Sequence, residues 1–238
     1  SGYPESPFYE CPKLTSIVVP EGVTTIPANA FNEATSFNSI TLPSTLTSIG
    51  NSAFHGCTGL RSIVIPDGVT SIGNNAFSDC TGLTSVVLPE GLTTLNYSTF
   101  ADCDGLTSIH LPDSITTMYD FVFAYCDNLS SVNYPRNWTT KSNRNSGYPE
   151  SPFYECPKLT SIVVPEGVTT IPANAFNECD SLLKIYIPSS VEIIGNNAFY
   201  DHNVNLTIYG EAGSTAEAWA DSNSITFVST SIPADEEA

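Results

Sequence analysis

A pattern of 23 residues recurs along this 238-residue chain, with proline, phenylalanine and cysteine at fixed places in it. One unit, Cys57 to Cys80, reads C-x2-L-x2-I-x-I-P-x2-V-x2-I-x4-F-x2-C. A repeat of this length predicts a solenoid, because one unit cannot bury its own apolar face and must stack on its neighbours. The proline marks the units at Pro20, Pro43, Pro66, Pro89, Pro112, Pro135, Pro165 and Pro188.

Each unit predicts one β-strand that ends at its proline. In the stretch Ser62–Pro66, Ile63 and Ile65 would point inward and Val64 outward. Proline has no N–H for a strand ladder and therefore belongs at the end of the strand. The next stretch predicts a short extended or turn-like second side, and the residues before each phenylalanine predict one helical turn. Stacked units predict a β-rich α/β solenoid of about nine turns, with one parallel strand per turn.

Phenylalanine and cysteine form two columns of predicted core residues. Phenylalanine recurs at Phe8, Phe31, Phe54, Phe77, Phe100, Phe123, Phe153, Phe176 and Phe199, which predicts a stack of aromatic rings. Cysteine recurs at Cys11, Cys57, Cys80, Cys103, Cys126, Cys156 and Cys179. An odd number of thiols, with Ala34 and His202 accepted at the same register, favours small buried free cysteines. Disulfides and a metal site remain the less favoured alternatives.

The repeat unit closely resembles the BspA-like, treponemal-type class of leucine-rich repeats, over about residues 8–209. The closing segment 206–228 is similar to the C-terminal cap of bacterial members, in which Ser214 or Thr215 would cap a short helix that contains Trp219. The resemblance implies a curved, right-handed leucine-rich-repeat solenoid from an extracellular or cell-surface bacterial protein that binds host proteins. It implies no catalytic residue, cofactor or metal.

The period breaks once, at the insertion 136–152. We expect one solenoid over residues 1–228, with its cap at 206–228 and a flexible acidic tail or linker at 229–238.

A longer repeat is superimposed on the short one. Residues 1–33 are identical to residues 146–178, an offset of 145. The identity indicates duplication of a larger block or a graft by design. Since the second copy begins inside a connection between units, we expect the chain to be a piece of a longer array.

Charge and hydropathy exclude several classes of partner. Seven Lys and Arg against 25 Asp and Glu leave a net charge of −18, which opposes binding to nucleic acid. The sequence has no run of 18 apolar residues that would insert into a membrane, and no signal segment is present in it. We expect a monomer that binds a protein ligand and needs no cofactor.

The recurring serines do not indicate a catalytic nucleophile. Catalysis needs one activated serine beside a base, whereas serine recurs at one register and suggests hydrogen bonds between coils. The column is Ser16, Ser39, Ser62, Ser85, Ser108, Ser131 and Ser161. The histidines His55, His110 and His202 share no register, and no phosphate-binding or dinucleotide motif is present. We therefore expect no enzymatic activity.

The candidate ligand site is the part of the predicted sheet face that departs from the repeat. Outward positions read Val18, Thr41, Val64, Val87, His110, Asn133, Val163 and Tyr186. A largely acidic rim follows the strands, and only Arg136 is basic in it. We favour His110, Asn133 and Arg136 as ligand-binding residues, with Trp138 and Tyr186 as further candidates. The alternative is a solvated face that binds nothing.

The insertion 136–152 is the second candidate site. It contains Arg136, Lys141 and Arg144, together with Trp138, and could contact an acidic or aromatic protein surface. It could equally be a tolerated surface loop whose tryptophan packs on the adjoining coil. We therefore predict a non-enzymatic binding or adhesion module, with a structural spacer or stalk as the alternative.

Overall fold

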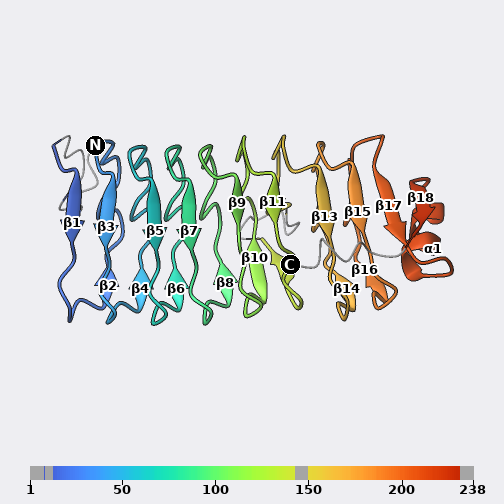
Figure 1. Cartoon of the computed structure of the whole chain (residues 1–238), viewed down its shortest axis with the longest axis horizontal. Helices are drawn as coiled ribbons and strands as arrows, with labels where there is room; N and C mark the ends of the chain where they lie inside the picture. Colours follow the sequence, from blue (N-terminus) through green and yellow to red (C-terminus); the bar gives the residue numbers. More distant parts are fainter. Residues whose placement is uncertain (1–7, 9–12, 143–149, 231–238) are drawn as a thin grey trace.

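The computed structural model describes Phe8 and residues 13–142 and 150–230. Figure 1 shows coils stacked in one elongated row, from β1 (Ser16–Val18) at one end to α1 (Thr215–Ser222) at the other. Paired residues in neighbouring coils lie one repeat apart, so that β1 pairs with β3 (Ser39–Thr41) in parallel. The predicted solenoid of about nine turns is confirmed.

The first strand of each coil contributes to a main sheet on one side of the solenoid. After β1 and β3 its strands are β5 (Ser62–Val64), β7 (Ser85–Val87), β9 (Ser108–Ile109), β11 (Ser131–Val132), β13 (Ser161–Val163), β15 (Lys184–Tyr186), β17 (Thr207–Gly210) and β18 (Thr226–Ser229). Ile63 and Ile65 are buried whereas Val64 is exposed, as the alternation predicted. The serine column is exposed, and side-chain hydrogen bonds between coils come instead from the residue before it, as Thr84 donates to the Arg61 carbonyl.

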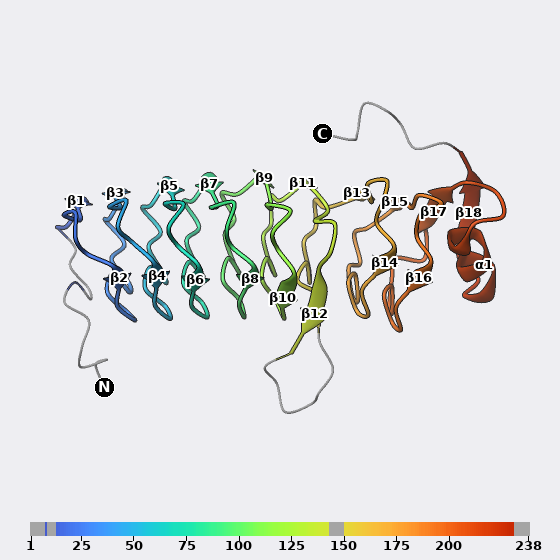
Figure 2. The ribbon, with the colours of Figure 1, turned by 90° about the horizontal axis from the view of Figure 1, so that it is seen from below.

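A second strand in each coil, most often of two residues, forms another parallel ladder, which the sequence predicted only as an extended or turn-like side. Its strands are β2 (Thr25–Ile26), β4 (Ser48–Ile49), β6 (Ser71–Ile72), β8 (Thr94–Leu95), β10 (Thr117–Tyr119), β12 (Thr139–Lys141), β14 (Thr170–Ile171) and β16 (Ile193–Ile194). Each coil therefore has two strands rather than one. The two ladders lie on different sides, with β9 and β11 away from β10 and β12 (Figure 2).

The segment before each core phenylalanine is a series of turns, so the predicted helical turn is wrong. Asn75 and Asp79 adopt positive φ angles of 54° and 60°, a conformation that Asn and Asp tolerate better than most residues. The N–H of Phe77 donates to the carbonyl of Thr99 in the next coil, at 2.9 Å. Alternate N–H groups bond across coils in this way, which a helix would not permit.

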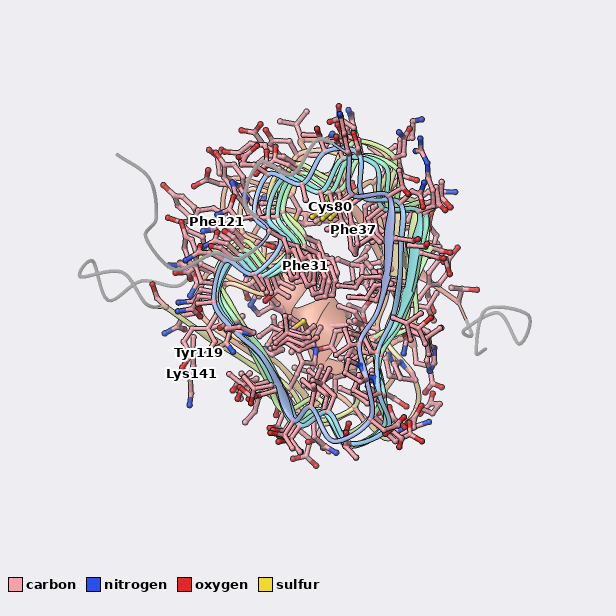
Figure 3. The ribbon with its side chains drawn as sticks, turned by 90° about the vertical axis from the view of Figure 1, so that its left-hand side faces the viewer. Phe31, Phe37, Cys80, Tyr119, Phe121 and Lys141 are labelled. Atoms are coloured by element: carbon pink, nitrogen blue, oxygen red, sulfur yellow. The ribbon has the colours of Figure 1, made fainter. Side chains whose placement is uncertain are left out.

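The phenylalanine and cysteine columns form the core. Neighbouring rings of the phenylalanine column lie 5.1–6.1 Å apart and within 16° of parallel. The six described cysteines are buried and free, and the thiol of Cys80 donates to the carbonyl of Phe54 at 3.1 Å. Figure 3 shows Phe31 and Cys80 in the interior of the solenoid. Burial raises the pKa of Cys57 and Cys126 to about 12.

The last coil is covered by α1 and β18. Ser214 is the N-cap of α1, and its hydroxyl accepts the N–H of Glu217, as predicted. The indole of Trp219 packs edge-to-face on Phe199 at 5.3 Å between ring centroids. Most of the predicted tail 229–238 lies outside the described residues.

Candidate functional site

A cavity of about 490 Å³ opens on the main sheet around β9, β11 and β13. His110 and Asn133 directly follow β9 and β11 in adjacent coils, Arg136 follows Pro135 in the coil of Asn133, and all three line the cavity. The other lining residues are Glu90, Asp113, Ser130, Ser131, Val132, Tyr134, Ser161, Val163 and Pro165. The structure thus brings together three of the five predicted ligand-binding residues.

Asn133 alters the strand pairing at the floor of this cavity. In four other coils, the residue after an outward position donates its N–H to a main-chain carbonyl of the next coil, as Ile65 does to Val87 at 3.0 Å. Here the N–H of Leu111 donates to Oδ1 of Asn133 at 2.6 Å, and Nδ2 of Asn133 donates to the Leu111 carbonyl at 2.8 Å. The carboxamide replaces a peptide group in the ladder, and β9 and β11 each end after two residues.

The insertion separates the coils on the far side of the cavity. Pro135 and Pro165 are 30 residues apart (165 − 135) instead of 23. In the described ladders β11 pairs with β9 but not with β13, and β12 pairs with β10 but not with β14. The ladders also break without an insertion, between β3 and β5, between β7 and β9 and between β6 and β8, but among the described coils both ladders break between the same two coils only at the insertion. The cavity lies along this double break.

Arg136 spans the interruption at the rim. Its Nε lies 3.6 Å from Oδ2 of Asp113 in the preceding coil, and its Nη1 donates to the carbonyl of Glu166 in the following coil. Both charged side chains of the pair are largely exposed, so the ion pair itself adds little stability. The half-exposed guanidinium lines the cavity with two of its nitrogens, Nε and Nη1, already engaged.

Two residues of the insertion, Ser142 and Glu150, are hydrogen-bonded to the buried carboxylate of Asp120. Oδ2 of Asp120 accepts the hydroxyl of Ser142 at 2.6 Å, and Oδ1 accepts the N–H of Glu150 at 2.9 Å. Asp120 is fully buried, so these bonds replace the water that the carboxylate loses. This carboxylate ties Ser142 and Glu150 to the coil that contains Asp120.

The remaining predicted site residues lie elsewhere. Trp138 is only 4% exposed and packs edge-to-face on Tyr134, at 5.6 Å between ring centroids, so it belongs to the core rather than to a ligand surface. Burial raises the pKa of Tyr134 well above its usual value. Tyr186 stacks on Tyr209 at 4.8 Å along β15 and β17, away from the cavity lining.

The basic residues of the insertion do not form one cationic group. Arg136 lies on the main-sheet rim, whereas Lys141 pairs with Tyr119 in the second ladder. Figure 3 places Lys141 and Tyr119 together on one side of the solenoid. Arg144 lies outside the described residues.

Two carboxylates of the lining, Glu90 and Asp113, were missed as site residues because they match the acidic rim of other coils. The offset between Asp113 and Arg136 is one repeat (136 − 113 = 23), so the register alone could have predicted their ion pair. The serines of the lining were missed because they follow the repeat.

The lining is chemically suited to binding through hydrogen bonds and charge. It combines one guanidinium, one imidazole, two carboxylates and several hydroxyl groups around Val132 and Val163. Within the described residues, no three His, Cys, Asp or Glu side chains are placed to hold a metal ion. The same part of the chain contains no helix with the length and apolar character that a membrane crossing requires.

Comparison with known proteins identifies the repeat. A profile described as "BspA type Leucine rich repeat region (6 copies)" matches residues 3–130 and 146–217. No curated protein gives a significant match.

Solved structures of bacterial leucine-rich-repeat proteins are similar. One from Bacteroides ovatus is 26% identical, with a TM-score of 0.52, covering 84% of this chain and 70% of that one. The T. pallidum leucine-rich-repeat protein is 21% identical, with a TM-score of 0.50 and coverage of 90% and 86%, which indicates a shared fold. A leucine-rich cell surface protein from Faecalibacterium prausnitzii is 30% identical, with a TM-score of 0.49; the match covers 92% of this chain but 64% of that one.

Proposed function

The chain belongs to the BspA-type leucine-rich-repeat family, and from this premise we propose that it is a non-enzymatic protein-binding module of a bacterial cell-surface or secreted protein. The ligand would contact the main sheet at the cavity around His110, Asn133 and Arg136. One observation carries this proposal: His110 and Asn133, which depart from the repeat at the outward register of adjacent coils, line one cavity together with Arg136. Proteins of the family are generally binding modules rather than catalysts.

The lining determines what kind of surface would fit. Asp113 already partners Arg136, while Glu90 and His110 supply further polar groups in an acidic protein. A protein segment with several hydrogen-bonding groups and at least one cationic side chain complements this arrangement best. A cavity of about 490 Å³ admits a few side chains rather than a whole domain, so the surrounding sheet would supply the rest of the contact area.

The test is binding to a panel of purified extracellular-matrix and serum proteins, measured by biolayer interferometry. The variants take residues found at the same registers in other coils: His110→Val, since Val64 and Val87 occupy that register, and Arg136→Glu, since Glu166 does. Each should weaken a saturable interaction about tenfold or more, as expected for central contacts. Val64→Thr, on the same face but outside the lining, is the matched control, because Thr41 shares its register.

Binding that survives both cavity substitutions would show that the ligand docks elsewhere. The absence of saturable binding to any panel member would favour the structural spacer, which requires no selective face.

A further inference from the structure

Four aromatic side chains form a cluster on the side of the solenoid away from the main sheet. The aromatic cluster consists of Tyr97, Phe121, Tyr125 and Tyr154. Phe121 packs edge-to-face on Tyr97 at 5.8 Å and on Tyr154 at 5.3 Å, and Tyr125 packs edge-to-face on Tyr154 at 5.5 Å. Tyr125 is 42% exposed and the other three are partly exposed. Figure 3 places Phe121 on the same side as Tyr119 and Lys141.

Three of the four members depart from what their own columns contain in other coils, whereas Tyr154 shares its register with Tyr9 and Tyr200. Phe121 takes the register of Asn29, Ser52, Asn75, Ser98, Asn174 and Asn197. Tyr125 takes the register of Glu33, Gly56, Asp79, Asp102, Glu155, Glu178 and Asp201. Tyr97 stands where Asn51 and Asn74 do. Aromatic residues have therefore replaced polar ones at separate registers that meet in space.

The backbone makes two of these replacements unfavourable for folding. Phe121 and Tyr125 adopt positive φ angles of 61° and 60°. Asn, Asp and Gly tolerate this region, whereas a bulky aromatic side chain rarely occupies it. Residues held in such a conformation at a surface point to a role other than stability.

Carboxylates flank the cluster, because Asp102 and Glu155 occupy the register of Tyr125 in the two adjoining coils. Besides burial, the charges of Glu155, Asp102 and Glu178 raise the pKa of Tyr125. Burial, together with nearby aspartates, raises the pKa of Asp102. The faces of aromatic rings attract cations, and flanking carboxylates strengthen that attraction. Lys141 is a basic residue on this side, and it is paired with Tyr119 in the strand ladder.

We propose that the aromatic cluster is a second interaction surface, which receives an arginine or lysine side chain from a basic segment of another protein. The occupant follows from charge: the exposed rings are bordered by Asp102, Glu155 and Glu178 in a protein of net charge −18. This surface is distinct from the main-sheet cavity, because none of its four residues lines that cavity.

The probe is a fluorescein-labelled peptide of four Gly-Arg repeats, with fluorescence anisotropy read at about 150 mM salt. An analogue with neutral citrulline in place of arginine tests the need for charge. The double substitution Phe121→Asn with Tyr125→Gly installs residues found at the same registers, such as Asn75 and Gly56. It leaves the net charge unchanged and removes backbone strain, so the variant should unfold at the same or a higher temperature.

Tyr200→Asn is the matched control. Tyr200 is 60% exposed, belongs to another coil, and shares its register with Asn32 and Asn177. We expect the double variant to bind the peptide about five- to thirtyfold more weakly, the loss of two cation–π contacts. The control should match the wild type within about twofold, and the citrulline peptide should not bind.

Equal binding by the wild type and the double variant would overturn the proposal, since the peptide would then be attracted by the overall negative charge of the protein. Equal weakening by Tyr200→Asn, or no saturable binding to the wild type, would also overturn it. These outcomes leave the cavity proposal untouched, because the panel experiment reads a different surface.

Discussion

Asn133 offers a test of how the cavity forms, because its carboxamide stands in for a peptide group of the main-sheet ladder. The substitution Asn133→Asp keeps the acceptor for the Leu111 N–H but removes the donor to the Leu111 carbonyl. At neutral pH an ionised oxygen would then face a carbonyl oxygen across the 2.8 Å that now joins Nδ2 to it. Only a protonated carboxyl group could restore the second hydrogen bond.

The expected loss in the free energy of unfolding follows from this hydrogen-bond geometry. A buried carbonyl left without its donor costs about 1–3 kcal/mol. Asn133 is only half-buried, so we expect the lower part of that range, about 1–2 kcal/mol in the free energy of unfolding. In a chain of this size, 1 kcal/mol corresponds to a shift in Tm of roughly 2–4 °C.

The direction in which pH changes the stability of the Asn133→Asp variant follows from the pKa of the new carboxyl group. Desolvation and the facing carbonyl would raise the folded-state pKa of the new aspartate above its unfolded value. The destabilisation is then present in full above the folded pKa and disappears as the pH falls below the unfolded pKa near 4. The assay is urea unfolding of variant and wild type, compared at pH 7.5 and again at the lowest pH at which the wild type folds.

Asn137→Asp is the matched control, because Asn137 is exposed, lies four residues away and gains the same charge. It should change the free energy of unfolding by less than about 0.5 kcal/mol at either pH. Equal stability of the two variants at pH 7.5, or a difference that does not shrink in acid, would refute the role assigned to the Asn133 carboxamide.

Three further predictions concern the core and the cap. Phe77→Ala should lower the free energy of unfolding in urea by about 3–5 kcal/mol, because the fully buried ring packs on Phe54 at 5.1 Å and on Phe100 at 5.3 Å. A loss below about 1 kcal/mol would contradict a stacked core. The six described thiols should react with a disulfide reagent at pH 8 only as fast as the protein unfolds, since burial raises the pKa of thiols such as Cys57 to about 12; rapid reaction of several thiols would oppose this. Ser214→Ala should cost about 1 kcal/mol, seen as fraying of α1 in hydrogen exchange, whereas an unchanged exchange rate would show that packing alone holds the helix.

The fold was predictable wherever the same physical demand recurs in every coil. Inward apolar residues, strand-ending prolines and the phenylalanine column occur about nine times, so chance cannot produce their pattern. The second ladder was missed because a two-residue strand such as β6 is too short to show alternation. The turns near Asn75 were missed because their hydrogen bonds run to the next coil, whereas a helical prediction considers only local partners.

The site was predictable in part, for a related reason. Three candidates were predicted only because they differ from the residues at the same register in other coils: His110, Asn133 and Arg136. Trp138 was misassigned because it was considered as part of an insertion, although it stands three residues after Pro135 just as buried Ile115 stands three after Pro112.

A uniform solenoid cannot specify where along its face a ligand binds, because every coil presents the same groups at a constant spacing. Ser161, Val163 and Pro165 of the duplicated block line the candidate cavity, and identical residues occur at Ser16, Val18 and Pro20. The second copy follows the coil that supplies Asn133, Arg136 and the insertion. Any selectivity of the candidate site would therefore come from this junction rather than from the duplicated block. A copy of the duplicated block placed elsewhere in the array should form the same strands but should not form the cavity.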